Sequence, residues 1–501
     1  MPSAGRPSTP LGVSLAAPAG ATLRLSKGRS RGRAVGVISL GCPKNLVDTE
    51  VMLGLLREAG YRLVSDPEQA EVLLVNTCCF TEQARAEAAE ALSEAVQWRR
   101  SATGRALICA GCWPEMEAPE LRTTFPEIDA YMGPGDVPRV VSVVERALAG
   151  SGPQRPESRP SSFIYDEATP RLRTTAPWTA YLKIADGCRH RCRFCVIPRL
   201  RGRYRSRPLA SVIAEAQQLA AEGVREINLV AQDTTAYGTD VKAKGKWEKE
   251  KGERPDGNDI AGLLSALAGI EGVRWLRLLY GFPTAVTRKL VAVMAREERV
   301  CKYLDLPFQH GDRAVLRGMG RPGDGSSYLK LIARLRQAMP DIAIRSSFIV
   351  GFPGEGEDEF RRLLEFIEAA QLDRAGAFCY SPERGTPAAE MEGQVPSEVA
   401  QRRYHEFMVL QQRISLSRNR RWVGREIEAL IEAPGERKAC PERSRRGEWI
   451  GRSFRDAPEI DGTVKVRGAG PDVKPGEFVT VRVTEAEPYD LSAEASPSRR
   501  Q

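Results

Sequence analysis

The chain has 501 residues, of which 42% are hydrophobic and 28% charged, a balance typical of a globular protein with several domains. Eleven cysteines beside only three histidines argue against a secreted protein with a fully paired disulfide framework, and favour soft-metal chemistry in a reducing compartment. A net charge of +9 fits an acidic or nucleic-acid-containing partner, and no run approaches the roughly 20 apolar residues of a membrane span.

Residues 1–33 are rich in Pro, Ser, Gly and Ala, and they end in a basic run that begins at Lys27. The apolar stretch over residues 11–21 is broken by Pro18 and Gly20, and no basic segment precedes it, which argues against a signal peptide. We expect a disordered basic extension or an over-long start.

Residues 34–150 alternate between buried-strand runs and helical stretches. Strands are expected over 35–40, 72–75 and 106–109, and helices over 47–59 and 81–99. This alternation predicts a small domain with a parallel α/β sheet.

Three cysteines follow the expected strands of this first domain, namely Cys42, Cys78 and Cys112. Because the carboxyl ends of parallel strands meet at one edge of a sheet, the three thiols should converge and hold an iron-sulfur cluster. The alternative is that they pack as small hydrophobic residues. Cys79 and Cys109 are neighbours that could substitute as ligands, although Cys109 should point into the core.

Residues 151–176 are rich in Pro, Ser and Arg and are expected to form a linker. A second α/β series over 177–422 follows. Its strands are expected over 181–185, 226–230, 275–280, 303–306, 342–350 and 376–380, with Cys301 and Cys379 in the core. Six such units predict a partial (β/α) barrel with reactive groups at the carboxyl ends of its strands.

Directly after the first of these strands come Cys188, Cys192 and Cys195, spaced four and then three residues apart. A structural zinc site needs four ligands, whereas a 4Fe-4S cluster held by three cysteines leaves one iron free to chelate a small molecule. A zinc site with His190 as fourth ligand is the alternative. The spacing, with Phe194 before the last cysteine, resembles that of the radical S-adenosylmethionine (SAM) enzymes.

The charged segment 241–258 is expected to be a solvated insertion. A helix over 397–422 precedes residues 423–494, whose short alternating strands and glycines predict a small β-barrel with an insertion at 436–448 and a tail at 495–501. We expect its open faces to present basic residues to a polar macromolecule. These residues are Arg421, Arg425, Arg452 and Arg455.

From residue 34 to 491 the chain resembles the methylthiotransferase family, and within it the RimO type that modifies ribosomal protein S-twelve. The motifs that carry the resemblance are residues 39–48 (SLGCPKNLVD), 182–188 (LKIADGC), 230–235 (VAQDTT), 303–310 (YLDLPFQH) and 456–462 (DAPEIDG). The tRNA-modifying relatives usually carry Gln-Met-Asn after the first cysteine. Departures from the family pattern are Cys79, generally a glycine, and the two insertions.

The resemblance implies an N-terminal cluster domain, a radical SAM domain and a C-terminal TRAM barrel. It implies SAM and two 4Fe-4S clusters, one on Cys188, Cys192 and Cys195 that generates a 5′-deoxyadenosyl radical. The other, on the three N-terminal cysteines, carries the sulfur to be inserted. It also implies SAM contacts at Phe194, Gln232, Ile349 and Gly351, the last two within residues 349–355 (IVGFPGE), and it implies no catalytic residue beyond the cluster ligands.

The function implied by the resemblance is methylthiolation of the β-carbon of an aspartate in ribosomal protein S-twelve, free or in the small subunit. Flavodoxin or ferredoxin would supply electrons, in the cytoplasm and without a membrane partner. One alternative keeps the chemistry but acts on a tRNA adenosine. Another is a non-catalytic ribosome- or RNA-binding protein whose clusters are structural.

Overall fold

The computed structural model describes residues 32–152, 163–241, 257–435, 448–470 and 472–496. Residues 1–31 of the extension predicted over 1–33 therefore lie outside the described residues. So do most of the insertion 241–258, residues 436–447, and parts of the linker and the tail.

The chain divides into two compact units. The first contains the residues up to 176 together with 181–190 and 196–212, and the second contains 177–180, 191–195 and the chain from 213 onward. Among the described residues, no helix combines the length and apolar character needed to cross a membrane.

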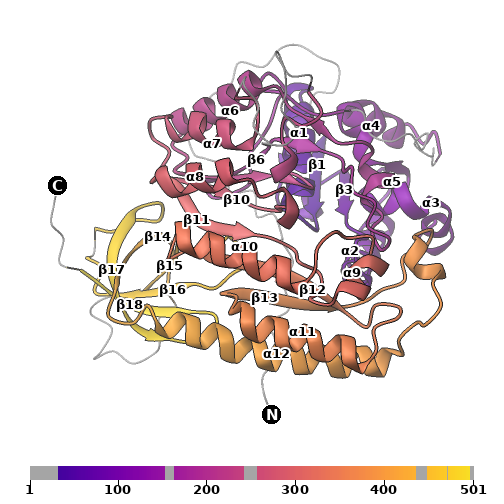
Figure 1. Ribbon diagram of the computed structural model, residues 1–501. Coiled ribbons are helices and arrows are strands. Elements are labelled where there is room, and N and C mark those ends of the chain that lie inside the picture. Colours follow the sequence, from indigo (N-terminus) through magenta and orange to yellow (C-terminus); the bar gives the residue numbers. More distant parts are fainter. Residues whose placement is uncertain (1–31, 153–162, 242–256, 436–447, 471, 497–501) are drawn as a thin grey trace, which may run out of the picture. The chain divides into compact units, whose positions relative to one another are not determined.

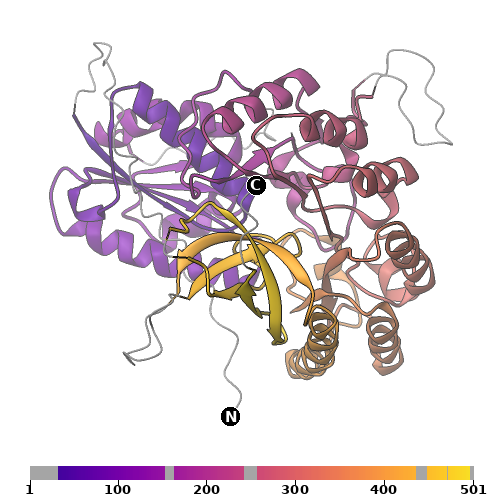
Figure 2. The same ribbon diagram turned by 90° about the vertical axis from the view of Figure 1, so that its left-hand side faces the viewer.

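A five-stranded parallel sheet lies at the centre of the first unit, with helices on both faces (Figures 1 and 2). In sheet order its strands are β2 (Arg62–Val64), β1 (Ala34–Ser39), β3 (Val72–Thr77), β4 (Ala106–Gly111) and β5 (Ala130–Met132). The helices are α1 (Pro43–Glu58), α2 (Glu82–Arg100), α3 (Cys112–Thr124) and α4 (Val140–Leu148), with 3-10 turns η1 (Pro67–Gln69) and η2 (Pro134–Arg139).

The predicted α/β alternation of this unit is confirmed, since every residue of β3 and β4 is buried, as expected for strands covered on both faces. Helix α1 begins four residues earlier than predicted, because Pro43 occupies its first position, where a proline needs no amide hydrogen. After residue 176 the unit contains the short strands β7 (Ala185–Asp186) and β8 (Arg205–Ser206) and the helix α5 (Ile197–Arg201).

Part of the segment predicted as a linker is fastened to helix α1. The carboxylate of Glu50 accepts hydrogen bonds from Arg171, with Nη2···Oε2 at 2.6 Å, and from the backbone amide of Thr174 at 2.7 Å. Both charged side chains are buried, so this stretch is a structured part of the first unit.

The second unit contains a sheet in the order β13-β12-β11-β10-β9-β6, an open partial barrel as predicted. The strands are β6 (Thr179–Lys183), which begins in this unit, β9 (Glu226–Val230), β10 (Trp275–Leu278), β11 (Val300–Asp305), β12 (Ala343–Val350) and β13 (Arg374–Cys379). The helices are α6 (Leu209–Ala221), whose first four residues belong to the first unit, α7 (Ile260–Ala268), α8 (Arg288–Arg296), α9 (Arg313–Gly318), α10 (Gly325–Ala338), α11 (Glu357–Ala370) and α12 (Ser397–Arg420). Three 3-10 turns are η3 (Thr234–Ala236), η4 (Pro283–Ala285) and η5 (Pro387–Glu390).

Cys301 is buried within β11, as predicted, but Cys379 is only half-buried. The reason is that β13 is the last strand in the order of the sheet, so its final residues have a neighbouring strand on one side alone.

Five further strands of the second unit close into the predicted barrel, drawn in orange to yellow in Figure 2. In barrel order they are β14 (Glu426–Pro434), β15 (Trp449–Ser453), β16 (Val464–Arg467), β18 (Leu491–Ala495) and β17 (Phe478–Ala486). Their inward residues, among them Ile431, Val464 and Val481, form a separate apolar core.

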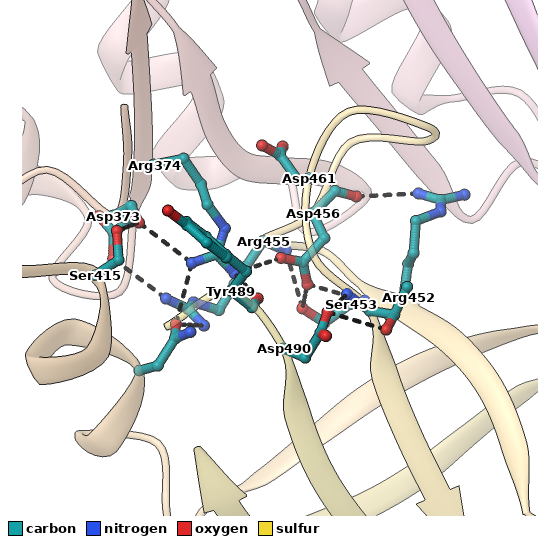
Figure 3. Close-up of polar contacts among 12 residues, drawn as sticks. Asp373, Arg374, Ser415, Arg452, Ser453, Arg455, Asp456, Asp461, Tyr489 and Asp490 are labelled. Atoms are coloured by element: carbon teal, nitrogen blue, oxygen red, sulfur yellow. Dashed lines mark hydrogen bonds and ion pairs between the residues drawn. The ribbon is translucent and has the colours of Figure 1, made fainter. Parts of the chain in front are cut away.

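The prediction that the barrel presents Arg452 and Arg455 on an open face is wrong. Both are buried against the sheet of the same unit, where Arg455 lies 3.2 Å from the carboxylate of Asp373 (Figure 3). Arg374 of β13 reaches the opposite way and donates to Asp456 of the barrel at 2.8 Å. Residues 456–462 therefore connect the barrel to the sheet, because Asp456 pairs with Arg374 and Asp461 with Arg345 of the sheet.

Candidate functional site

The three cysteines predicted at strand ends of the first unit lie together at one sheet edge. Cys42 follows β1, Cys78 follows β3, and Cys112 begins α3 directly after β4, and these strands are adjacent. Gly41 permits the approach, because a Cβ placed on it would lie only 2.6 Å from the Cβ of Cys78.

The protonation of these thiols reflects their mutual proximity. Burial raises the pKa of Cys78 to about 12, and the neighbouring Cys112 and Cys42 add to the rise. Burial also raises the pKa of Cys112, whereas at Cys42 the opposing charges of Lys44 and Arg201 outweigh burial and lower the pKa. Converging thiolates repel one another. Iron binds cysteine as the thiolate, and its positive charge would relieve that repulsion.

Four charged side chains are buried beside these cysteines. Asp48 accepts hydrogen bonds from Lys183 and from Arg201, the latter with Nη1···Oδ2 at 2.5 Å. Asp186 lies 3.5 Å from Lys183 and 3.6 Å from Arg201, measured from its Oδ2. Burial opposes the charge of Asp186, but the two cations outweigh it and hold its pKa at about 2. We call Asp48, Lys183, Asp186 and Arg201 the buried charge cluster.

The later cysteine triad falls in both units. In the first unit, the amide of Cys188 donates to the carbonyl of Gly202 at 3.1 Å, and its Sγ accepts from the amide of His190 at 3.4 Å. In the second unit, the amide of Cys195 donates to the carbonyl of Cys192 at 3.1 Å. All three cysteines are partly exposed.

Arg321 also contacts the triad in the second unit. Its Nη1 lies 3.8 Å from the Sγ of Cys192, its Nη2 donates to the carbonyl of Pro307 at 2.5 Å, and its guanidinium stacks on the ring of Phe282.

Gln232 carries a buried polar atom without a partner in the second unit. It follows β9, and its Oε1 makes no hydrogen bond within the described residues. An orphaned buried acceptor of this kind indicates a missing donor. Asp233 beside it is engaged locally, because its Oδ1 accepts from the amide of Ala236 at 3.2 Å and from the hydroxyl of Thr235 at 2.5 Å.

Phe194 and the glycine segment that follows β12 lie close together in the second unit. The ring of Phe194 meets that of Phe352 edge to face, with centroids 6.5 Å apart. Ile349, in β12, donates its amide to the carbonyl of Gln309, a residue held at the unusual φ of +71°. Gly351 directly follows β12.

A buried carboxylate holds this segment in place. Oε2 of Glu355 accepts from the amides of Gly351 at 3.0 Å and Phe352 at 3.4 Å, while its Oε1 lies 3.0 Å from Arg403. Gly351 is constrained from the other side, since a Cβ there would lie 2.6 Å from the Cβ of Ala400 at a φ of +73°. The glycine is thus required by packing against α12, a reason that its motif alone did not reveal.

Three family models match consecutive parts of the chain. Residues 34–133 match the uncharacterized protein family UPF0004, residues 182–367 the Radical SAM superfamily, and residues 423–495 the TRAM domain.

The relatives identify the family. The protein named "Ribosomal protein uS12 methylthiotransferase RimO" from Desulforamulus reducens is 44% identical over 92% of this chain and 99% of its own length. Its namesakes from Heliobacterium modesticaldum and Desulforudis audaxviator are 45% and 46% identical, over 92% of this chain and 95% and 96% of their own lengths. The chain belongs to the RimO family.

As a member of the RimO family, the chain is a radical SAM methylthiotransferase that uses SAM and 4Fe-4S clusters. A solved radical SAM methyltransferase, TsrM from Kitasatospora setae with tryptophan and a SAM analogue bound, shares the fold. It is 16% identical with a TM-score of 0.51, over 72% of this chain and 75% of that one.

The donor set fits the cofactors of the RimO family. Three converging thiols in the first unit suit one cluster, and the unpartnered Oε1 of Gln232 suits a polar small molecule. No group of three His, Cys, Asp or Glu side chains in the described ranges is arranged to hold a metal ion. A 4Fe-4S cluster, however, distributes its cysteines around four irons.

The two alternative cysteines of the first domain are engaged in packing. Cys79 is buried with Cys112, Val196 and Leu200 in one apolar cluster. Cys109 lies within β4, where burial raises the pKa of its thiol to about 12. Burial also raises the pKa of Cys79.

The buried charge cluster, Arg321 and Glu355 were not predicted from the sequence. A signal existed for Asp48, because the spacing of three to four residues places Lys44, Asn45 and Asp48 on one face of α1. Arg201 stands in an arginine-rich run that is typical of a solvated loop, so its composition concealed it.

Proposed function

We propose that this chain methylthiolates the β-carbon of an aspartate in ribosomal protein uS12 (S-twelve), free or in the small subunit. The observation that carries the proposal is that the chain combines near full-length similarity to RimO relatives with three cysteines converging at one sheet edge. When bound, SAM and the clusters supply the radical and the sulfur that acid–base chemistry lacks for an unactivated carbon.

The residues of the chain bind and orient these groups. Cys188, Cys192 and Cys195 hold the cluster that binds SAM, and Cys42, Cys78 and Cys112 hold the auxiliary, sulfur-carrying cluster. Arg321 restrains Cys192 through its contact with the sulfur.

SAM itself is oriented in the second unit. Gln232 offers its unpartnered oxygen to the nucleoside, Phe194 and the backbone around Ile349 and Gly351 line the adenine, and Glu355 positions that backbone. We further propose that a flavodoxin or a ferredoxin supplies the electrons, and that the reaction takes place in the cytoplasm without a membrane partner.

Iron analysis and substrate mass test the proposal. Anaerobically reconstituted protein should hold about eight irons, as two 4Fe-4S clusters. Incubation with SAM, sulfide, reductant and uS12 should increase the intact mass of uS12 by one methylthio group in place of a hydrogen. A tRNA treated in parallel should remain unchanged. A product on tRNA alone, or one zinc and no iron, would overturn the proposal.

Paired triple variants separate the two cysteine sets. Replacing Cys188, Cys192 and Cys195 by alanine should leave about four irons and abolish reductive SAM cleavage. Replacing Cys42, Cys78 and Cys112 should leave SAM cleavage intact and abolish methylthio transfer. Product formation at the normal rate in the second variant would show that those three cysteines do not hold the sulfur-carrying cluster.

A further inference from the structure

Arg201 is a buried cation whose guanidinium group reaches beyond the carboxylates that balance it. Its Nη1 faces Asp48 and Asp186. Its Nη2 lies 3.3 Å from the Oδ1 of Asn45 and 3.7 Å from the Sγ of Cys112. One edge of the group thus binds carboxylate, and the other binds a predicted ligand of the auxiliary cluster.

This division of contacts requires an arginine. The two cations of the buried charge cluster, Lys183 and Arg201, face its two carboxylates. The four charges of the buried charge cluster therefore sum to zero. An ammonium group in place of the guanidinium would keep that balance. A planar guanidinium, however, presents donors in a fixed fork and serves two partners at once.

The contact to sulfur favours a negative Cys112. The Nη2 of Arg201 lies 3.7 Å from the Sγ of Cys112, and both side chains are buried. A donor aimed at a cysteine sulfur also stabilises a cluster on that cysteine in its reduced state, because reduction adds a negative charge. Hydrogen bonds to sulfur are one of the factors that set cluster potentials.

Arg201 also restrains the segment that leads into Cys188. The Oδ1 of Asp186 accepts from the amide of Gly187 at 2.8 Å, while its Oδ2 lies near Arg201. The amide of Cys188 donates to the carbonyl of Gly202, the residue after Arg201. The Arg201 side chain thus contacts Cys112 directly, and through Asp186 it is linked to the backbone of Gly187, the residue before Cys188.

We propose that Arg201 is a positioning residue for the auxiliary cysteine set, and that its hydrogen bond to Cys112 raises the reduction potential of the auxiliary cluster. The inference rests on the proposed function, since it needs a cluster on Cys42, Cys78 and Cys112. It adds to that function a residue outside the ligand set that sets the properties of the sulfur-carrying site.

The test is a redox titration followed by electron paramagnetic resonance. It uses the full chain with Cys188, Cys192 and Cys195 replaced by alanine, so that only the auxiliary cluster contributes to the signal. In this background Arg201→Lys keeps the charge but removes the second donor edge, and we expect a lower midpoint potential with about four irons retained. Arg203→Lys, an exposed control two residues away, should leave the potential unchanged.

Each failure has its own signature. Equal potentials in Arg201→Lys and its parent, at equal iron content, would show that Arg201 is only structural. If Arg201→Lys does not fold, the pair Arg201→Met with Asp48→Asn keeps the buried charge balanced and should show the same lowered potential. A background protein without iron would overturn the proposed auxiliary cluster itself, and this inference with it.

Discussion

Arg452 in barrel strand β15 donates two hydrogen bonds to Glu226, the first residue of sheet strand β9, at N···O distances of 3.1 and 2.6 Å. Both side chains are buried, and Arg277 of β10 shares the same carboxylate at 3.1 Å. Arg452 of the barrel therefore binds the sheet at the amino end of β9. Gln232 and Gly351, in contrast, follow the carboxyl ends of β9 and β12.

This ion pair should be a major source of barrel stability. Replacing Arg452 by methionine leaves Glu226 with one cation fewer in a buried place, and breaking a buried pair costs about 3–5 kcal/mol. The control is Arg467→Met, because Arg467 pairs with Glu448 at the exposed surface and such a change costs at most about 0.5 kcal/mol. Chemical denaturation measures both, and equal losses would show that the buried pair contributes nothing special.

Acid should weaken the same joint. Burial opposes the charge of Glu226, but Arg452 and Arg277 outweigh it and hold its pKa at about 2. In the unfolded chain a glutamate has a pKa of about 4.3. Because the folded pKa is the lower one, the stabilisation is fully present above about pH 4.3 and is lost as the pH falls toward 2.

Glu226→Gln tests this pH dependence. Between pH 6 and pH 3 the free energy of unfolding of the natural chain should fall more steeply than that of the variant, which has no carboxylate to protonate at this place. Parallel curves from denaturation at each pH would contradict the prediction.

Gly351 should tolerate alanine less well than Gly354. Both have positive φ, +73° and +82°, but a Cβ at Gly354 meets nothing within 4 Å, whereas one at Gly351 meets Ala400. Gly354→Ala should cost about 1–2 kcal/mol for the left-handed backbone, and Gly351→Ala about 1–3 kcal/mol more from overpacking. Adding Ala400→Gly to Gly351→Ala should remove this extra loss of stability, as measured by thermal unfolding. No restoration would place the cost elsewhere.

Glu355 should matter for SAM affinity through the backbone that it holds. Glu355→Gln removes the charge that accepts two amides and faces Arg403. We expect SAM to bind about tenfold more weakly, a loss of about 1.4 kcal/mol. Glu357→Gln is the control, because Glu357 is exposed although it also pairs with Arg403. Calorimetric titration of cluster-loaded protein with SAM measures both, and equal affinities would show that Glu355 does not position the segment.

The sequence by itself determined the layers of this protein. Apolar runs followed by amphipathic stretches place β1, β3, β4 and α2 within a few residues of their observed bounds, because burial on both faces demands continuous apolar strands. The position of each cysteine after a strand was readable for the same reason, and parallel topology then brings Cys42, Cys78 and Cys112 to one edge.

Only the tertiary structure decided which charged residues are buried. The sequence predicts Arg452 and Arg455 as surface cations. In the structure each is buried in an ion pair with a residue distant in the sequence, Arg452 with Glu226 and Arg455 with Asp373. The same holds for Arg201, whose partner Asp48 lies 153 residues earlier. A charge can leave water only when an opposite charge and hydrogen bonds compensate it. That compensation depends on three-dimensional neighbours, which no local pattern encodes.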